Sequence, residues 1–231
     1  MHLGTPSHAD PHVPRPGTAL GLFVAILLLQ ILVSLLFRST HFWASVLTGQ
    51  LGAILLPTFA LIWWRGYDRQ RCIPFTCRSG MAWQQRCGTA LLIICSAIVV
   101  VQLTELGIRW TKSIIQTTPL FEEQYAAWLH PTSVAHAGAL LGALALLPAF
   151  TEELLFRGLL QGSFAHAYGA RIGLLLSSAL FAVAHGNLSF FHLYFGLGCY
   201  LGLLRLKSGA LWWPILAHVT NNAWTLVSRH F

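Results

Sequence analysis

Residues 18–37 read TALGLFVAILLLQILVSLLF, twenty residues without a single charge. An α-helix rises 1.5 Å per residue, so about 20 apolar residues cross a hydrocarbon core of roughly 30 Å. The whole chain has the same character, because its 231 residues are 55% hydrophobic and 9% charged. Soluble proteins carry about 25% charged residues. The sequence therefore predicts an integral membrane protein.

Several apolar stretches of this kind follow one another along the chain. They predict an all-α, polytopic bundle of about seven transmembrane helices, or eight if a further short segment precedes Leu144. The predicted spans are 18–37, 42–64, 87–108, 144–164, 172–185, 188–206 and 210–227. They divide the chain into a polar leader (1–17), N-terminal membrane helices and loops (18–132) and a C-terminal membrane core (133–231).

The positive charge of the chain is distributed in a way that indicates topology. Its 14 Lys and Arg residues give a net charge of +7, but they lie in short segments between apolar stretches. A nucleic-acid partner is not expected, because it would favour a single basic stripe. With seven spans, face A of the membrane carries Arg15, Arg65, Arg69, Arg71, Arg78, Arg86, Arg171, Arg205 and Lys207, and face B carries Arg38, Arg109, Lys112 and Arg229. The positive-inside rule makes face A, and with it the N-terminus, cytoplasmic.

Three acidic residues fall inside apolar stretches, where an ionisable group costs at least ~2.5–3.5 kcal/mol near the bilayer centre. Glu105 precedes Arg109 by four residues near the end of its span, so an interfacial ion pair explains it. Glu153 and Arg157 are also four apart and share one helix face. Glu152 points about 100° away and has no partner in the sequence, which leaves it available for chemistry. The alternative is that both acids form ion pairs that lock helices together.

Two later spans carry further pairs at helical spacing, Phe181-Ala-Val-Ala-His185 and His218-Val-Thr-Asn-Asn222. Each pair lies on one face of its helix. A lone intramembrane histidine usually makes a hydrogen bond between helices, but two histidines, an asparagine and an unpaired glutamate exceed what packing requires. We therefore expect these side chains to meet in one functional site.

Depth in the membrane tests whether these residues can meet. From the helical rise, Glu152, His185, His218 and Asn222 come within about 10–18 Å of face B. This estimate requires residues 134–143 to be either an extra short segment or an extension of the helix beyond the bilayer. The sequence thus predicts one shallow cavity that opens toward face B.

The three motifs resemble those of the CAAX prenyl endopeptidase and bacteriocin-processing (CPBP, or Abi) family of intramembrane proteases. That family's successive helices carry EExxxR, FxxxH and HxxxN, matched here by Glu152-Glu153-xxx-Arg157, Phe181-xxx-His185 and His218-xxx-Asn222. The resemblance covers residues 147–227 and implies a four-helix catalytic core in the C-terminal half. The first ~130 residues show nothing specific to the family.

The resemblance also implies a reaction, the hydrolysis of peptide bonds by a water molecule that Glu152 activates. His185 and His218 would position this water, and Asn222 would stabilise the oxyanion. The supporting residues would be Glu153, Arg157 and Phe181. Zinc stays open as an alternative, because Glu152, His185 and His218 are also a catalytic zinc set. No cofactor is favoured, since the HExxH helix of many zinc proteases is absent.

The expected partners are the lipid bilayer and a membrane-anchored or lipid-linked protein or peptide substrate. The expected location is the inner (plasma) membrane of a bacterium. A site that opens away from the cytoplasm argues against a prenylated substrate. Two other interpretations remain: a non-proteolytic immunity or scaffold protein whose polar cluster binds a partner, and a small transporter with a proton relay.

Overall fold

The computed structural model describes residues 12–37, 41–75, 83–117 and 125–230, and these residues form helices and connections without a β-strand. The major helices are α1 (Pro16–Phe37), α2–η2–α3 (Phe42–Trp64), α5 (Trp83–Ile114), α8–η3–α9–η4–α10 (Val134–Tyr168), α11 (Ala170–Ala184), α12 (Phe191–Ser208) and α13 (Trp212–His230). The short helices α4 (Arg69–Cys72), α7 (Ala126–Leu129) and η5 (Leu188–Phe190) lie in connections. The predicted all-α class is confirmed, and each predicted span has a helix.

Four helices of the described part of the chain are long and apolar enough to cross a membrane. They are Pro16–Phe37, Phe42–Trp64, Gln84–Ile114 and Val134–Tyr168. Helix α11 is apolar but shorter, and α12 and α13, with 18 and 19 residues, carry more polar side chains. The count of seven or eight spans therefore stays a prediction.

The outer surface of the bundle is apolar. On α1, Phe23 and Ile26 are buried against the rest of the protein, whereas Leu28 and Leu36 are 63% and 68% exposed. The same contrast recurs on α5, where Leu92 is 72% exposed. Water would make such a continuous apolar surface unfavourable, but lipid chains cover it at no cost. The chain is an integral membrane protein.

The long helix Val134–Tyr168 differs from its prediction, because the predicted span, 144–164, is too short at its N-terminal end. The helix begins after Ser133, whose hydroxyl accepts a hydrogen bond from the main-chain N–H of His136 at 3.1 Å. This is the arrangement of an N-cap. No break separates residues 134–143 from the rest, so they extend the helix rather than form an extra segment. Its 35 residues span about 50 Å, more than a hydrocarbon core.

Wide, π-helical turns interrupt two of the long helices. These are η2 (Thr48–Leu55), η3 (Gly142–Leu146) and η4 (Leu154–Leu160). Pro57 follows η2 and Pro148 follows η3, and proline has no N–H to continue an α-helical ladder. A wide turn accommodates the missing hydrogen bond and rotates the side chains around it.

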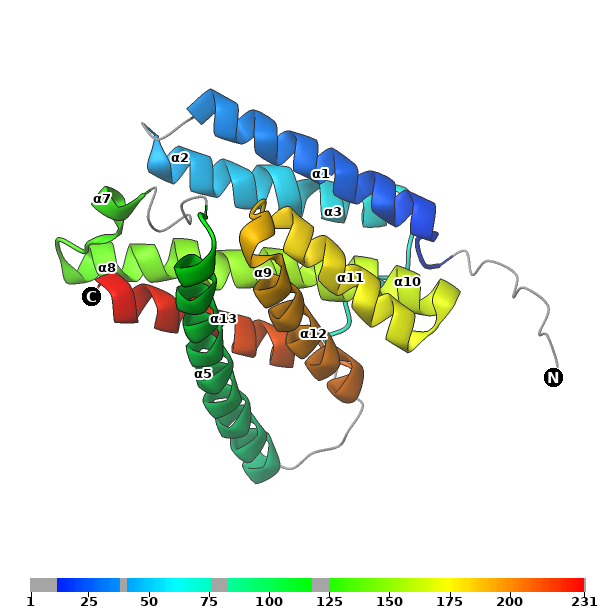
Figure 1. The fold of residues 1–231 in the computed structure, drawn as a ribbon. Helices are drawn as coiled ribbons and strands as arrows, with labels where there is room; N and C mark the ends of the chain where they lie inside the picture. Colours follow the sequence, from blue (N-terminus) through cyan, green and yellow to red (C-terminus); the bar gives the residue numbers. More distant parts are fainter. Residues whose placement is uncertain (1–11, 38–40, 76–82, 118–124, 231) are drawn as a thin grey trace.

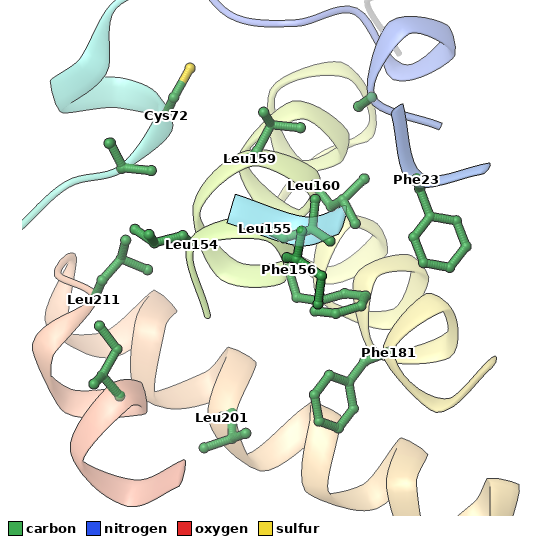
Figure 2. Close-up of a cluster of buried hydrophobic side chains, with 14 of the residues drawn as sticks. Phe23, Cys72, Leu154, Leu155, Phe156, Leu159, Leu160, Phe181, Leu201 and Leu211 are labelled. Atoms are coloured by element: carbon green, nitrogen blue, oxygen red, sulfur yellow. The ribbon is translucent and has the colours of Figure 1, made fainter. Parts of the chain in front are cut away.

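The core of the bundle surrounds η4, whose seven residues are all buried. Figure 1 shows the long α8–α10 helix running between α1, α2 and α3 on one side and α13 on the other. The buried side chains drawn in Figure 2 include Phe23, Cys72, Leu154, Leu155, Phe156, Leu159, Leu160, Phe181, Leu201 and Leu211. They come from six parts of the chain. The helix that carries the two adjacent glutamates is thus the central helix of the molecule.

The segment that follows α3 packs into one end of the bundle. A Cβ atom at Gly158 would lie only 2.7 Å from the main-chain oxygen of Cys72, so glycine permits this close approach. The main-chain oxygen of Pro74 accepts a hydrogen bond from the N–H of Leu211 at 2.9 Å. At the same end, the Ser163 hydroxyl donates to the oxygen of Pro14 at 2.6 Å. These contacts gather the start of α1 and the ends of α3 and α10 on one face, as the predicted topology requires.

Candidate active site

The centre of the site is the carboxylate of Glu153, which is fully buried. Its Oε1 atom accepts hydrogen bonds from Arg157 Nη1 at 2.7 Å and from His218 Nδ1 at 2.9 Å. The guanidinium of Arg157 also donates from Nη2 to the main-chain oxygen of Gly198 at 3.1 Å. The predicted pair between Glu153 and Arg157 is present. Glu153 additionally holds His218, so it joins the central helix to α13.

The aromatic residue of the second motif, Phe181, contacts three other side chains of the site. Its buried ring lies 4.3 Å from the guanidinium carbon of Arg157, a cation–π distance. The same ring lies 4.5 Å from the His185 ring and 5.8 Å from the His218 ring, measured between centroids. Phe181 therefore holds both histidines and the arginine in place.

Glu152 points away from this ion pair, as its position on the helix predicts. Its Oε2 atom lies 4.0 Å from His218 Nε2, which is longer than a hydrogen bond. That oxygen is buried and has no hydrogen-bond partner among the described residues. Since Arg157 neutralises only one of the two adjacent acids, Glu152 brings an uncompensated carboxylate to the site.

His185 ends α11, just before Gly186, whose φ of 66° terminates the helix. Its Nδ1 atom donates to the main-chain oxygen of Phe181 at 2.8 Å. A carbonyl accepts only, so in the neutral ring the proton is on Nδ1 and the lone pair is on Nε2. The ring stacks on Tyr194 of α12, with centroids 4.1 Å apart and planes inclined by 24°.

Asn222 lies one helical turn after His218 on α13. Its Oδ1 atom accepts a hydrogen bond from the amide of the neighbouring Asn221 at 3.4 Å. The four predicted site residues, Glu152, His185, His218 and Asn222, all line one cavity of about 490 Å³. The structure thus brings together the residues that the sequence predicted to meet, and their roles in catalysis remain predictions.

The remaining intramembrane acid also lines this cavity, but its predicted partner is wrong. Glu105 of α5 forms its ion pair with Arg229 of α13 and not with Arg109. Arg109 is near Glu105 in sequence, whereas α13 packs along α5 and brings Arg229 to it. This ion pair links two helices at the face B end of the cavity.

Glu152, His185 and His218 are the residues that the sequence offers as a zinc set. Within the described ranges, no group of three His, Cys, Asp or Glu side chains lies close enough to hold a metal ion. The Nδ1 atom of His218 already donates to Glu153, which leaves Nε2 as its only possible ligand atom. The residues do not form a zinc set in this arrangement, and we assign no step to a metal.

Two features of the cavity were missed from the sequence. Tyr194 supports His185, and an aromatic residue in an apolar helix gives no signal of such a role. Gln50 of η2 lines the cavity, and Thr151 donates to its side-chain oxygen at 2.5 Å. A glutamine inside an apolar stretch is a signal that the sequence does offer, because a side-chain amide needs a partner within a membrane.

The comparisons with known proteins agree with the predicted family. Residues 134–224 match the family described as type II CAAX prenyl endopeptidase Rce1-like. Over 78 residues the chain is 28% identical to the Bacillus subtilis (strain 168) protein named "Putative membrane peptidase YdiL". This match covers 34% of the chain and 32% of that relative, about a third of each. No solved structure matches the chain significantly.

The family match contains all three motifs, from Glu152 to Asn222. The predicted resemblance to the CPBP family is confirmed for this segment. The descriptions of both matches name a peptidase.

Proposed function

Because residues 134–224 carry the CPBP-family segment, we propose that the protein is an intramembrane endopeptidase of the glutamic type. The observation that carries this proposal is the convergence of Glu152, His185, His218 and Asn222 on one cavity. Among the described residues the Oε2 atom of Glu152 has no hydrogen-bond partner and lies 4.0 Å from His218 Nε2, so Glu152 is the group available to take a proton.

The hydrogen bonds of the two histidines determine which ring nitrogen is available to bind water. In both rings Nδ1 donates to a fixed acceptor, Phe181 O for His185 and Glu153 Oε1 for His218. Each neutral ring then offers the lone pair of Nε2, which accepts a hydrogen bond from water. A water molecule bound in this way has its oxygen free to attack when Glu152 removes a proton.

The proposed reaction balances without a cofactor. The water oxygen bonds to the peptide carbonyl carbon while Glu152 takes a proton, and the carbonyl oxygen becomes an oxyanion. The Asn222 amide donates to that oxyanion, a contribution typically worth about 10²–10³ in rate. The C–N bond then breaks, and Glu152 returns the proton to the leaving amine.

The proposed substrate is a membrane-anchored or lipid-linked protein that is cleaved near face B. The cavity extends from Glu152 to Arg229, in the half of the molecule where α13 ends. In the proposed topology this half is the exterior one, in a bacterial inner membrane with the N-terminus in the cytoplasm. Substrates would then be exported proteins whose anchors reach the outer half of the bilayer.

The test compares the membrane proteins of cells that carry the wild type or Glu152→Gln at matched expression. The wild type should release or shorten specific proteins, and Glu152→Gln should leave them intact. Asp68→Asn is the control, because Asp68 caps α4 and is not among the described residues that line the cavity, and asparagine caps equally well. Identical products in wild type and Glu152→Gln would favour a role in binding a partner and would exclude this mechanism.

A further inference from the structure

One cavity wall carries an amide that the proposed reaction does not use. Gln50 lies in η2, on the opposite side of the central helix from α13 (Figure 1). Its Oε1 atom accepts a hydrogen bond from the Thr151 hydroxyl at 2.5 Å. Thr151 is fully buried and directly precedes Glu152 in the chain. The amide is therefore fixed to the central helix one residue from the proposed general base.

The contact with Thr151 sets the direction of the amide. Thr151 is also near the carbonyl oxygens of Leu147 and Pro148, at 3.1 and 3.2 Å, but Gln50 is its shortest partner. With Oε1 held there, Nε2 occupies the other corner of the planar group. Gln50 lines the cavity, and in the described part of the chain Nε2 makes no hydrogen bond. Its two N–H donors are available to whatever enters.

A peptide segment bound in the cavity needs hydrogen-bond donors such as the N–H groups of Gln50. Cleavage requires an unwound peptide, and an unwound peptide in a membrane has main-chain groups without partners, each costing several kcal/mol. Asn222 lines the cavity from α13 and can donate to the peptide from that side. Gln50 offers a donor from the η2 wall.

We propose that Gln50 is a substrate-binding residue whose Nε2 donates to a main-chain carbonyl beside the scissile bond, with Thr151 as the residue that positions it. This inference rests on the proposed protease function and deepens it. It assigns a role in the peptide site to η2, which lies outside the family match. Gln50 lies in the π-helical turn before Pro57, and this turn packs against α9 of the central helix.

The proposal predicts a particular split in the kinetic constants. A hydrogen bond made equally in the bound substrate and in the transition state affects KM and leaves kcat unchanged. Gln50→Leu should raise KM about three- to tenfold, the usual effect of one hydrogen bond, with kcat within about twofold of wild type. Gln50→Glu, which keeps an oxygen for Thr151 but loses the donor, should raise KM as well.

Variants of Thr151 provide a second test, because the proposal gives Thr151 a role only through its hydrogen bond with Gln50. Thr151→Val should raise KM by less than Gln50→Leu does, and Thr151→Ser should resemble the wild type since it keeps the hydroxyl. The double variant Gln50→Leu/Thr151→Val should have the KM of Gln50→Leu alone. Such non-additivity separates a positioning residue from an independent one.

The experiment measures initial rates with the purified full-length protein in dodecyl maltoside micelles. The probe is a membrane protein whose cleavage in cells is lost with Glu152→Gln. Thr48→Val is the matched control, because Thr48 lies in the same π-helical turn as Gln50 but is exposed and is not among the described residues that line the cavity. The melting temperature of every variant is measured to exclude unfolding.

The outcomes separate the two proposals. A raised KM in Gln50→Leu and Gln50→Glu, absent in Thr48→Val, supports the inference. An unchanged KM in either Gln50 variant, or effects of Gln50→Leu and Thr151→Val that simply multiply, overturns it and leaves the protease function intact. If the wild type cleaves no protein in a Glu152-dependent way, the proposed function fails, and the role of Gln50 fails with it.

Discussion

Arg157 is the largest fully buried side chain of the described residues, and it forms an ion pair with the buried Glu153. Burial of either charge alone is far more costly than burial of the pair. Arg157→Met should therefore lower stability by about 3–5 kcal/mol, since Glu153 would keep its charge without a cation. At roughly 2–4 °C per kcal/mol, the melting temperature in micelles should fall by about 10 °C.

The control for this prediction removes both charges. Glu153→Leu/Arg157→Met replaces the pair by apolar side chains and should regain most of the lost stability, although His218 then loses its acceptor. A double variant that is less stable than Arg157→Met would show that the ion pair does not account for the effect.

The spacing rule for helices predicts some of these contacts and cannot predict others. Glu153 and Arg157 pair because residues four apart share a helix face. Glu105 obeys the same rule with Arg109, yet it pairs with Arg229, which is 124 residues away. The bond between Glu153 and His218 spans 65 residues. Contacts of this kind depend on how helices pack, which the periodicity of one helix does not determine.

At the scale of the elements, the contact between η4 and the segment after α3 depends on a single glycine. Gly158→Ala would place a Cβ atom 2.7 Å from the oxygen of Cys72. We expect this variant to lose about 1–3 kcal/mol, the usual cost of overpacking. Gly138→Ala, in the same long helix but with open space around it, should be neutral or slightly stabilising. Thermal unfolding in micelles distinguishes the two.

The reactivity of the Cys72 thiol indicates whether the contact between Gly158 and the main chain of Cys72 is intact. Burial, together with the negative charge of Asp68, raises the pKa of the Cys72 thiol to about 11. A raised pKa means that the reactive thiolate is scarce at neutral pH and increases about tenfold per pH unit until pH 11. Maleimide should label Cys72 slowly at pH 7, and faster as the pH rises.

The comparison for this labelling is Cys87, which is exposed at the start of α5. It should react rapidly at pH 7 in the folded protein. Gly158→Ala should accelerate the labelling of Cys72 and leave that of Cys87 unchanged. Equal rates for the two cysteines in the wild type would contradict the packing of this segment.

The positions of the helices could be predicted from the sequence, but their ends could not. Apolar length located all seven, because only apolar side chains can face lipid. The helix that begins at Val134 was predicted ten residues too late, since no charge marks its start and the cap at Ser133 is a local signal. The π-helical turns were not predicted, although Pro57 and Pro148 indicate where an α-helical ladder must break.

At the scale of the whole molecule, the proposed topology places the two ends of the central helix on opposite sides of the membrane. In intact cells, and on a cysteine-free background, Val134→Cys should react with a membrane-impermeant maleimide, because Val134 is 91% exposed at the face B end. Arg69→Cys should react only after the membrane is permeabilised. The reverse pattern would place the cavity opening in the cytoplasm and would make cytosolic substrates the ones to test.

The site itself was predictable only in part at this scale. Glu152, His185, His218 and Asn222 could be chosen from the sequence because polar groups are costly in a membrane and these four follow the motifs of one family. The cavity also depends on α1, η2 and α5, which contribute Ser34, Gln50 and Glu105. These helices lie outside the family match, and only the folded bundle shows which of their polar side chains face inward.

In the proposed mechanism Glu152 activates the water that cleaves a peptide bond. The substrate for the test is a membrane protein whose cleavage in cells is lost with Glu152→Gln. The purified protein cleaves this substrate in micelles prepared in ¹⁸O-labelled water, with and without a zinc chelator. We expect the wild type to place one ¹⁸O atom in the new C-terminal carboxylate at a rate that the chelator does not change. Glu152→Gln should be slower by at least about 10³-fold, within the usual range for loss of a general base. A Glu152→Gln variant that cleaves at the wild-type rate, or a wild type that the chelator inactivates, would contradict this account.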